Sequence, residues 1–148
     1  MTRALLAGGV LVLVSLSGCA DQTEKYCSTL EDKQATLTDL AKSADQPGSD
    51  FIGESLAVLE DLRRDAPDDV ADEWDTIIFA WQGLAEAIDA AGVDPAEYQS
   101  GKMPPGVDDA KAKAIEGAAV ELASPRVADA GKGIEQHADD VCKVDFGL

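Results

Sequence analysis

Residues 68–91 constrain the fold of this chain more than any other stretch, because their apolar side chains repeat with the period of an α-helix. At 100° per residue these side chains fall on one face, as expected of a helix that buries one side in a protein core. The face consists of Val70, Trp74, Ile77, Ile78, Trp81, Leu84, Ala85 and Ile88. Pro67 and the carboxylates of Asp68 and Asp69 are typical of a helix start. We therefore expect a long amphipathic helix that needs partner helices to cover its apolar face.

Four further segments show weaker versions of the same pattern. They cover residues of about 22–44, 51–64, 108–123 and 125–141. The breaker cluster QPGSD separates the first two, and there Ser49 or Asp50 can cap the next helix. Ser124 followed by Pro125 is a start signal for the last segment. The sequence therefore predicts an all-α bundle of five helical segments.

Two glycines stand inside the last predicted helix, at Gly131 and Gly133. Each weakens a helix by roughly 1 kcal/mol relative to alanine. Close approach of a neighbouring helix would justify them, so we expect such an approach at this place.

An apolar, uncharged run over residues 4–14 follows Arg3 and has the plan of a secretory signal peptide. It is shorter than the ~20 apolar residues that a membrane-spanning helix needs. The run leads into Leu16-Ser17-Gly18-Cys19, which resembles the lipobox of bacterial lipoprotein precursors. In that family a diacylglyceryl group is attached to the cysteine thiol and the chain is cut before that cysteine. The alternative is an ordinary signal peptide with a cysteine near its cleavage site by chance.

The lipobox resemblance implies a division of the chain. Residues 1–18 would be a lipoprotein signal peptide, residues 19–24 a lipidated tether and residues 25–148 the helical domain, with residues 92–106 as a long internal linker. Two acyl chains anchor a protein stably, whereas one does so only marginally. We therefore expect attachment through lipid on Cys19 to the outer face of the cytoplasmic membrane.

The chain has three cysteines, an odd number that needs an explanation in an exported protein. If Cys19 carries lipid, Cys27 and Cys142 remain as a pair. A bond between them would join the start of the first helix to the end of the last, and disulfides are expected outside the reducing cytoplasm. No C-x-x-C motif accompanies them, so we expect a structural bond and not a redox-active one.

The composition is strongly acidic, with 29 acidic and 12 basic residues and a formal net charge of −17. Nucleic-acid binding depends on neutralising phosphates with Lys and Arg, so the charge excludes this class of partner. Anionic headgroups are repelled as well, which leaves lipid as the means of membrane attachment. Solubility outside the cell explains the charge.

Trp74 and Trp81 lie one heptad apart on the long helix, and we expect both in the core. The alternative is a pair of rings that stacks on a ligand. Phe79 projects from the opposite face, among acidic and polar residues, and something should cover it.

The connection over residues 92–106 is long for an interhelical loop, and such loops are often functional or disordered. It carries Val93, Tyr98 and Met103, which we expect to fold back onto Phe79. The alternative is that Phe79, Tyr98 and Met103 form an exposed patch for a partner.

Candidate catalytic and metal-ligating residues are few. Ser55 lies in a near match to the nucleophile elbow, but that motif needs a strand before it, and here the pattern is helical. His137 is the single histidine, which is too little for a transition-metal site, and we expect it at the surface or boundary of the core. The carboxylates of residues 65–75 lack the loop spacing of an EF-hand. We therefore expect no catalytic residue, no metal and no cofactor.

A second resemblance covers most of the chain. Its residues are Tyr26-Cys27, Ala66-Pro67-Asp68-Asp69-Val70 with Glu73-Trp74, Ser124-Pro125 and Val141-Cys142. Together they resemble the layout of many small exported helical proteins and lipoproteins of GC-rich Gram-positive bacteria. The resemblance implies the helical fold and the disulfide, and it implies no activity.

These observations favour a non-enzymatic surface lipoprotein that engages another envelope protein through the tether, Phe79 or an acidic face. The alternative is a carrier or sensor whose helices part around a small apolar ligand or lipid near Trp74 and Trp81. Small-molecule sites do occur between the helices of bundles, so we keep the carrier or sensor as a hypothesis beside the envelope-protein contact.

Overall fold

The computed structural model describes residues 17–43, 46, 48–98, 103 and 105–145, with the backbone alone for residues 17–20. Within these residues the chain forms helices and turns and no strand. The elements are α1 (Ser17–Ser43), α2 (Phe51–Asp65), α3 (Asp68–Ala91), α4 (Asp109–Leu122), α5 (Pro125–His137) and the π-helix η1 (Ala138–Cys142). The predicted all-helical fold is confirmed.

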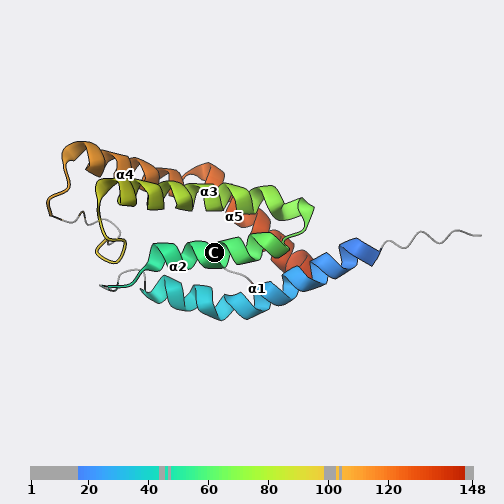
Figure 1. The fold of residues 1–148 in the computed structure, drawn as a ribbon. Helices are drawn as coiled ribbons and strands as arrows, with labels where there is room; N and C mark the ends of the chain where they lie inside the picture. The colour runs from blue at the N-terminus through green and yellow to red at the C-terminus, as the bar shows by residue number, and fades with distance from the viewer. Residues whose placement is uncertain (1–16, 44–45, 47, 99–102, 104, 146–148) are drawn as a thin grey trace, which may run out of the picture.

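Helix α3 occupies the middle of the bundle (Figure 1). Helix α2 packs on one side of it, and α4 and α5 pack on the other. Helix α1 packs along α2, and it meets the C-terminal part of the chain at η1 and where Tyr26 packs on His137 of α5. The order of packing is therefore α1, α2, α3 and then α4 with α5, and η1 closes the series onto α1.

Local signals explain most helix ends. The carboxylate of Asp50 accepts a hydrogen bond from the Gly53 amide at 3.0 Å, and Ser124 caps α5 through the Val127 amide. Gly92 ends α3 in the left-handed conformation at φ 72°, which glycine adopts without strain. These caps confirm the predicted starts of α2 and α5.

The two ends of the helical domain differ from expectation. Helix α1 begins at Ser17, so the backbone of residues 19–24, which we expected to be a tether, is helical. The last helix was expected to run to residue 141 without change, but α5 ends at His137 and the chain continues as a π-helix. The wider π turn brings Cys142 to α1.

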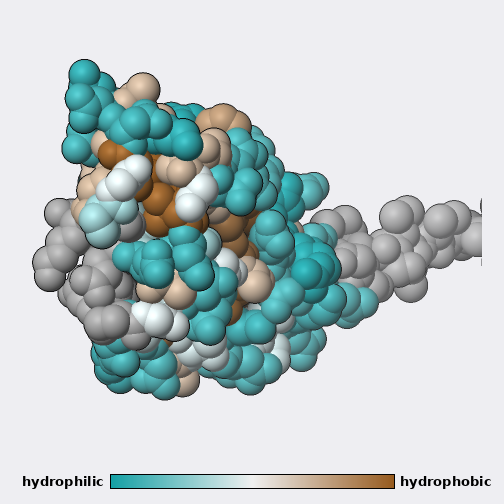
Figure 2. Space-filling view, turned by 60° about the vertical axis from the view of Figure 1, so that its left-hand side comes forward, coloured by the Kyte–Doolittle hydropathy of each residue, from teal (hydrophilic) through white to brown (hydrophobic). Residues whose placement is uncertain are grey.

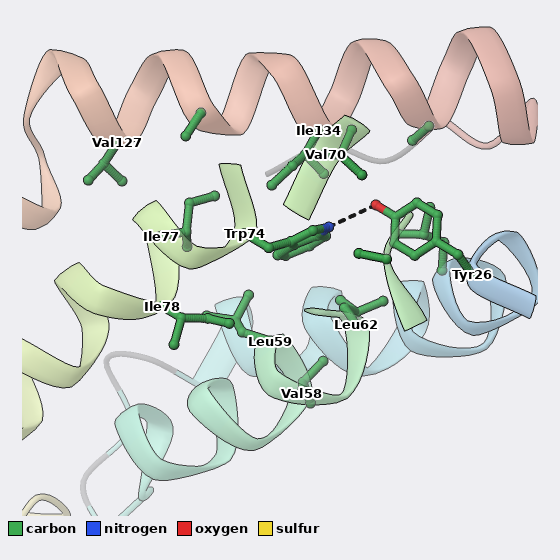
Figure 3. Close-up of a cluster of buried hydrophobic side chains, with 14 of the residues drawn as sticks. Tyr26, Val58, Leu59, Leu62, Val70, Trp74, Ile77, Ile78, Val127 and Ile134 are labelled. Carbon is green, nitrogen blue, oxygen red and sulfur yellow. Dashed lines mark hydrogen bonds between the residues drawn. The ribbon is translucent and has the colours of Figure 1, made fainter. Parts of the chain in front are cut away.

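The main core is built around Trp74 and Tyr26, both fully buried. The Trp74 Nε1 donates a hydrogen bond to the Tyr26 hydroxyl oxygen at 2.9 Å, which joins α3 to α1 (Figure 3). Large side chains from α2, α3 and α5 surround this pair, among them Leu62, Val70 and Ile134. Burial of the indole as a core residue, as predicted for Trp74, is confirmed.

A second cluster lies at the end of the bundle near the long connection. It contains Ile52, Leu84, Ile88, Val93 and Ile115, with Tyr98 and Met103 packed against it. The expectation that this connection covers Phe79 is wrong, because the Phe79 side chain is 66% exposed. After Gly92 the chain turns back so that the Val93 amide donates to the Ile88 carbonyl oxygen, which directs the connection onto the end of α3. Phe79 lies about 14 Å farther back along that helix at 1.5 Å per residue.

A disulfide joins Cys27 to Cys142, with 5.1 Å between the two Cα atoms. This confirms the predicted pairing. The bond links α1, which packs along α2, covalently to η1, which continues α5.

Candidate ligand-binding groove

A groove opens where α1 and α5 move apart. The disulfide and η1 hold α1 against the C-terminal end of the chain, but beyond them α1 follows α2 and α5 follows α3. The space between has a volume of about 960 Å³, within the range of ~300–1,000 Å³ that is typical of small-molecule sites. Its walls are the C-terminal half of α1 and most of α5, from Val127 to Glu135, and its floor comes from α2 and α3. Apolar residues line most of it, namely Leu37, Leu40, Ala41, Phe51, Leu59, Ile77, Trp81, Leu122, Ala123, Val127 and Ala128.

Several of these side chains belong to the main core as well. Leu59, Ile77 and Val127 come from α2, α3 and α5, and in Figure 3 Ile77 and Val127 lie on the side of Trp74 away from Tyr26. The floor of the groove is therefore the outer surface of a packed core. A ligand could add to this surface without unfolding it.

Trp81 is the largest side chain of the floor. It is half-buried and packs edge to face on Phe51, with 5.3 Å between ring centroids and 65° between ring planes. Such ring pairs stabilise each other by ~0.5–1.5 kcal/mol beyond their area of contact. The expectation that both tryptophans are core residues thus holds fully for Trp74 only, and Trp81 faces the groove. The predicted meeting of both indoles at one ligand site is not found.

Ser55 is the polar residue of the floor. It is 3% exposed, and its Oγ atom makes no hydrogen bond with any residue that the structure describes. Leaving a buried hydroxyl without a partner costs roughly 1–3 kcal/mol. Sequence reasoning singled out Ser55 only through a partial nucleophile motif, and its position on a helix with no histidine in the groove lining gives no support to that role.

Charged side chains mark the margins of the groove. Lys42 pairs with Asp39 at 2.9 Å, and Lys132 pairs with Asp129 at 3.0 Å, each across one helical turn. These four side chains are between two thirds and three quarters exposed, so each pair adds little to stability. The cations are thereby engaged with carboxylates of their own helices.

The two glycines of α5 serve different purposes. A Cβ atom on Gly133 would lie 3.1 Å from the Glu73 side chain, which confirms the expected close approach there. A Cβ on Gly131 would meet no heavy atom of the described residues within 4 Å, so close packing does not explain this glycine. Gly131 lines the groove, and its missing side chain widens the space between α1 and α5.

His137 is buried and lies away from the groove lining. Its exposed fraction is 9%, which corrects the expectation of a surface or boundary residue. Its Nε2 lies 3.4 Å from a carboxylate oxygen of Asp69, and its ring packs edge to face on Tyr26. Burial raises the pKa of the Tyr26 hydroxyl to about 12, with Asp69 adding to the rise and the hydrogen bond from Trp74 opposing it. This group of side chains is part of the core that joins α1, α3 and α5.

The remaining candidate residues lie elsewhere. Phe79 is exposed and stands outside the groove lining, while Tyr98 and Met103 are half-buried in the second cluster, where burial raises the pKa of Tyr98. The structure therefore does not bring these three together as one patch. The backbone of Cys19 lies in the first turn of α1, whereas Leu16 and the preceding residues lie outside the described part of the chain.

The face drawn in Figure 2 is mostly hydrophilic, with apolar surface in a strip between hydrophilic margins. Among the described residues, no helix is both long and apolar enough to cross a bilayer. In the same part of the chain, no three His, Cys, Asp or Glu side chains gather as a metal site would require.

No protein-family model, curated protein or solved structure matches this chain. The groove between α1 and α5 is the feature of the described residues on which the functional hypothesis is built.

Proposed function

We propose that this protein is a lipid-anchored carrier or sensor that binds one small apolar ligand in the groove between α1 and α5. The observation that carries the proposal is a groove of about 960 Å³ with a mostly apolar lining and a half-buried Trp81 on its floor. Burial of apolar ligand surface against this floor supplies the binding energy, at about 25 cal/mol per Å² of surface removed from water.

The anchor is proposed at Cys19. Its support is the lipobox-like Leu16-Ser17-Gly18-Cys19 together with the pairing of the other two cysteines, which leaves Cys19 outside the disulfide. Changing Cys19 to serine should move the protein from the membrane fraction to the soluble fraction and abolish incorporation of labelled palmitate. A Cys19→Ser protein that stays in the membrane fraction would refute the anchor.

The lipid on Cys19 is not the ligand that we propose for the groove. Cys19 and Leu37 lie 18 residues apart in the continuous helix α1, which is about 27 Å at 1.5 Å per residue. One leaflet of a bilayer, and hence an extended acyl chain, spans about half of the ~30 Å hydrocarbon core. The anchor therefore holds the groove at a distance that its own acyl chains do not cover.

Ligand binding can be tested on the exported chain carrying Cys19→Ser, with 1-decanol as the probe and tryptophan fluorescence as the readout. We expect saturable binding that changes the emission of Trp81, so that the signal persists in Trp74→Phe and is lost in Trp81→Phe. Gly131→Leu should fill the groove and abolish binding. Gly117→Leu is the matched control, because Gly117 is an exposed helical glycine of α4 outside the groove lining.

Two outcomes would refute the carrier. One is that neither 1-decanol nor any co-purified apolar molecule is found on the protein by titration and native mass spectrometry. The other is that Gly131→Leu binds 1-decanol as tightly as Gly117→Leu does.

A second function, a non-catalytic contact with another envelope protein, is favoured by one observation. Phe79 is 66% exposed and stands outside both apolar clusters of the described residues, and Asp75 near it on α3 is paired with Arg63. Large exposed aromatic side chains are enriched where proteins bind one another. Crosslinking in cell envelopes from position 83, one turn along α3 from Phe79, tests this role, and loss of the crosslinked species in Phe79→Ser would support it. Equal crosslinking from position 120, where Val120 is 71% exposed, would show that the contact is nonspecific.

A further inference from the structure

We propose that the ligand is an uncharged, single-chain amphiphile whose hydroxyl or carbonyl oxygen hydrogen-bonds to the Oγ atom of Ser55. The inference rests on the proposed function and adds the chemical class of the ligand. It starts from Ser55, a residue of the groove floor whose Oγ atom is buried and has no hydrogen-bond partner among the described residues.

The missing hydrogen bond of Ser55 is unusual within this chain. Thr29, Thr38 and Thr76 also lie inside helices, and each donates its hydroxyl to the carbonyl oxygen four residues earlier, at 3.1, 2.9 and 2.9 Å. That bond is the ordinary way for a helical hydroxyl to satisfy itself. Ser55 is more deeply buried than any of these, yet it lacks the bond. A rotation about χ1 moves a helical serine hydroxyl between its own backbone and the neighbouring space. A hydrogen-bond partner in the groove would satisfy the Ser55 hydroxyl.

The other polar side chains of the lining are already engaged. The Thr38 hydroxyl donates to its own helix, Lys42 and Lys132 pair with aspartates, and Glu135 has a partner as well. Ser55 is thus the lining residue that offers an unused hydrogen bond among the residues described. One hydroxyl matches one polar group on the ligand.

Charge argues against an anionic ligand. The protein carries a net charge of −17, and the two lysines at the groove margins form exposed ion pairs with Asp39 and Asp129. A carboxylate brought to the depth of Ser55 would meet one hydroxyl and no unpaired cation, and an unpaired buried charge is far more costly than an unpaired hydroxyl. An alcohol, ester or amide group carries no such cost.

The dimensions of the groove indicate an elongated ligand. Its floor extends along α2 from Phe51 to Leu59, and its wall extends along α5 from Val127 to Glu135, which is about 12 Å in each case at 1.5 Å per residue. One leaflet of a bilayer holds acyl chains over ~15 Å. A single chain of medium length therefore fits, with Ser55 near the middle of the floor between Phe51 and Leu59.

The test compares three probes of equal chain length: decane, 1-decanol and decanoate. Each is titrated into the disulfide-bonded Cys19→Ser chain and into the same chain with Ser55→Ala. We expect Ser55→Ala to weaken 1-decanol by about 10-fold, the factor that corresponds to ~1.4 kcal/mol, and to leave decane unchanged. Thr76→Val, at a helical residue outside the groove lining whose hydroxyl is used within its own helix, is the matched control and should leave the affinities for decane and 1-decanol unchanged.

The outcomes separate this inference from the proposed function. If decane and 1-decanol bind but Ser55→Ala changes both affinities equally, the contact with Ser55 is refuted while the carrier survives. If decanoate binds more tightly than 1-decanol, the uncharged class is refuted. If no probe binds, the proposed function fails and this inference with it. Ser55→Ala removes a hydroxyl without a partner, so the variant is expected to fold, and circular dichroism will verify this before titration.

Discussion

Replacing Cys27 and Cys142 together by alanine should lower the free energy of unfolding by about 5 kcal/mol. The bonded residues are 115 positions apart, and closing a loop of that length removes roughly 16 cal/mol/K of entropy from the unfolded chain on the chain-entropy model. At 25 °C this corresponds to ~5 kcal/mol. Small domains have total stabilities of about 5–15 kcal/mol, so the bond accounts for a large share. The unfolded state, and not a contact in the folded one, carries most of this effect.

The measurement is urea unfolding followed by circular dichroism, with Cys19→Ser in every protein so that no third thiol can exchange. Reductant should destabilise the disulfide-bonded chain to the level of the double variant and leave the double variant unchanged. A drop below ~1 kcal/mol would refute the loop-entropy reasoning. A drop caused by reductant in the double variant would show that the reagent acts elsewhere.

Three further predictions concern α5, the core and the surface. Gly131→Ala and Gly117→Ala should each stabilise their helix by up to ~1 kcal/mol in thermal unfolding, but only Gly131→Ala should change ligand affinity, because only Gly131 lines the groove. The pKa of Tyr26 rises to about 12 from the ordinary 10, so stability should fall by about 2–3 kcal/mol as the pH rises from 10 to 12, and Tyr26→Phe should remove this loss from the pH profile of unfolding. The hydrogen bond from Arg63 lowers the pKa of Asp75. The stability that this pair contributes is therefore present above the ordinary pKa of a carboxyl group and is lost as the pH falls through the lowered pKa. Asp75→Asn should reduce the acid sensitivity of unfolding.

The helix most accurately predicted from sequence is α3, whose expected range of 68–91 agrees with the structure. Its apolar face, its acidic first turn and the left-handed Gly92 at its end are all local signals. The start of α1 was missed by five residues because residues 17–21 are small or polar and carry no apolar period. The π turn was missed because the pairing of Cys142 with α1 is a tertiary constraint on the end of α5.

The groove could not be read from periodicity. A hydrophobic period shows which face of a helix is apolar, but it does not show whether two apolar faces will meet. Leu37 and Ala41 belong to the helical period of residues 22–44, and in the structure they line the groove. One local signal was available in Gly131, a glycine inside a helix where alanine would fit. The connection after Gly92 was assigned to the wrong partner, since sequence does not show toward which neighbour a loop turns.

Two departures from ordinary helical packing coincide at the groove. Trp81 remains half-buried although α3 is otherwise the best-packed helix of the bundle, and Ser55 is buried without the hydrogen bond that comparable hydroxyls of this chain form. Folded chains generally satisfy such groups, and the sites where they fail to do so are enriched in function. The disulfide explains how the chain tolerates the separation of α1 and α5 at the groove. It holds the N-terminal part of α1 to the C-terminal end of the chain and leaves the rest of the two helices apart. A bundle that needed only to be stable would gain from bringing these two helices together, so the separation itself argues for an occupant.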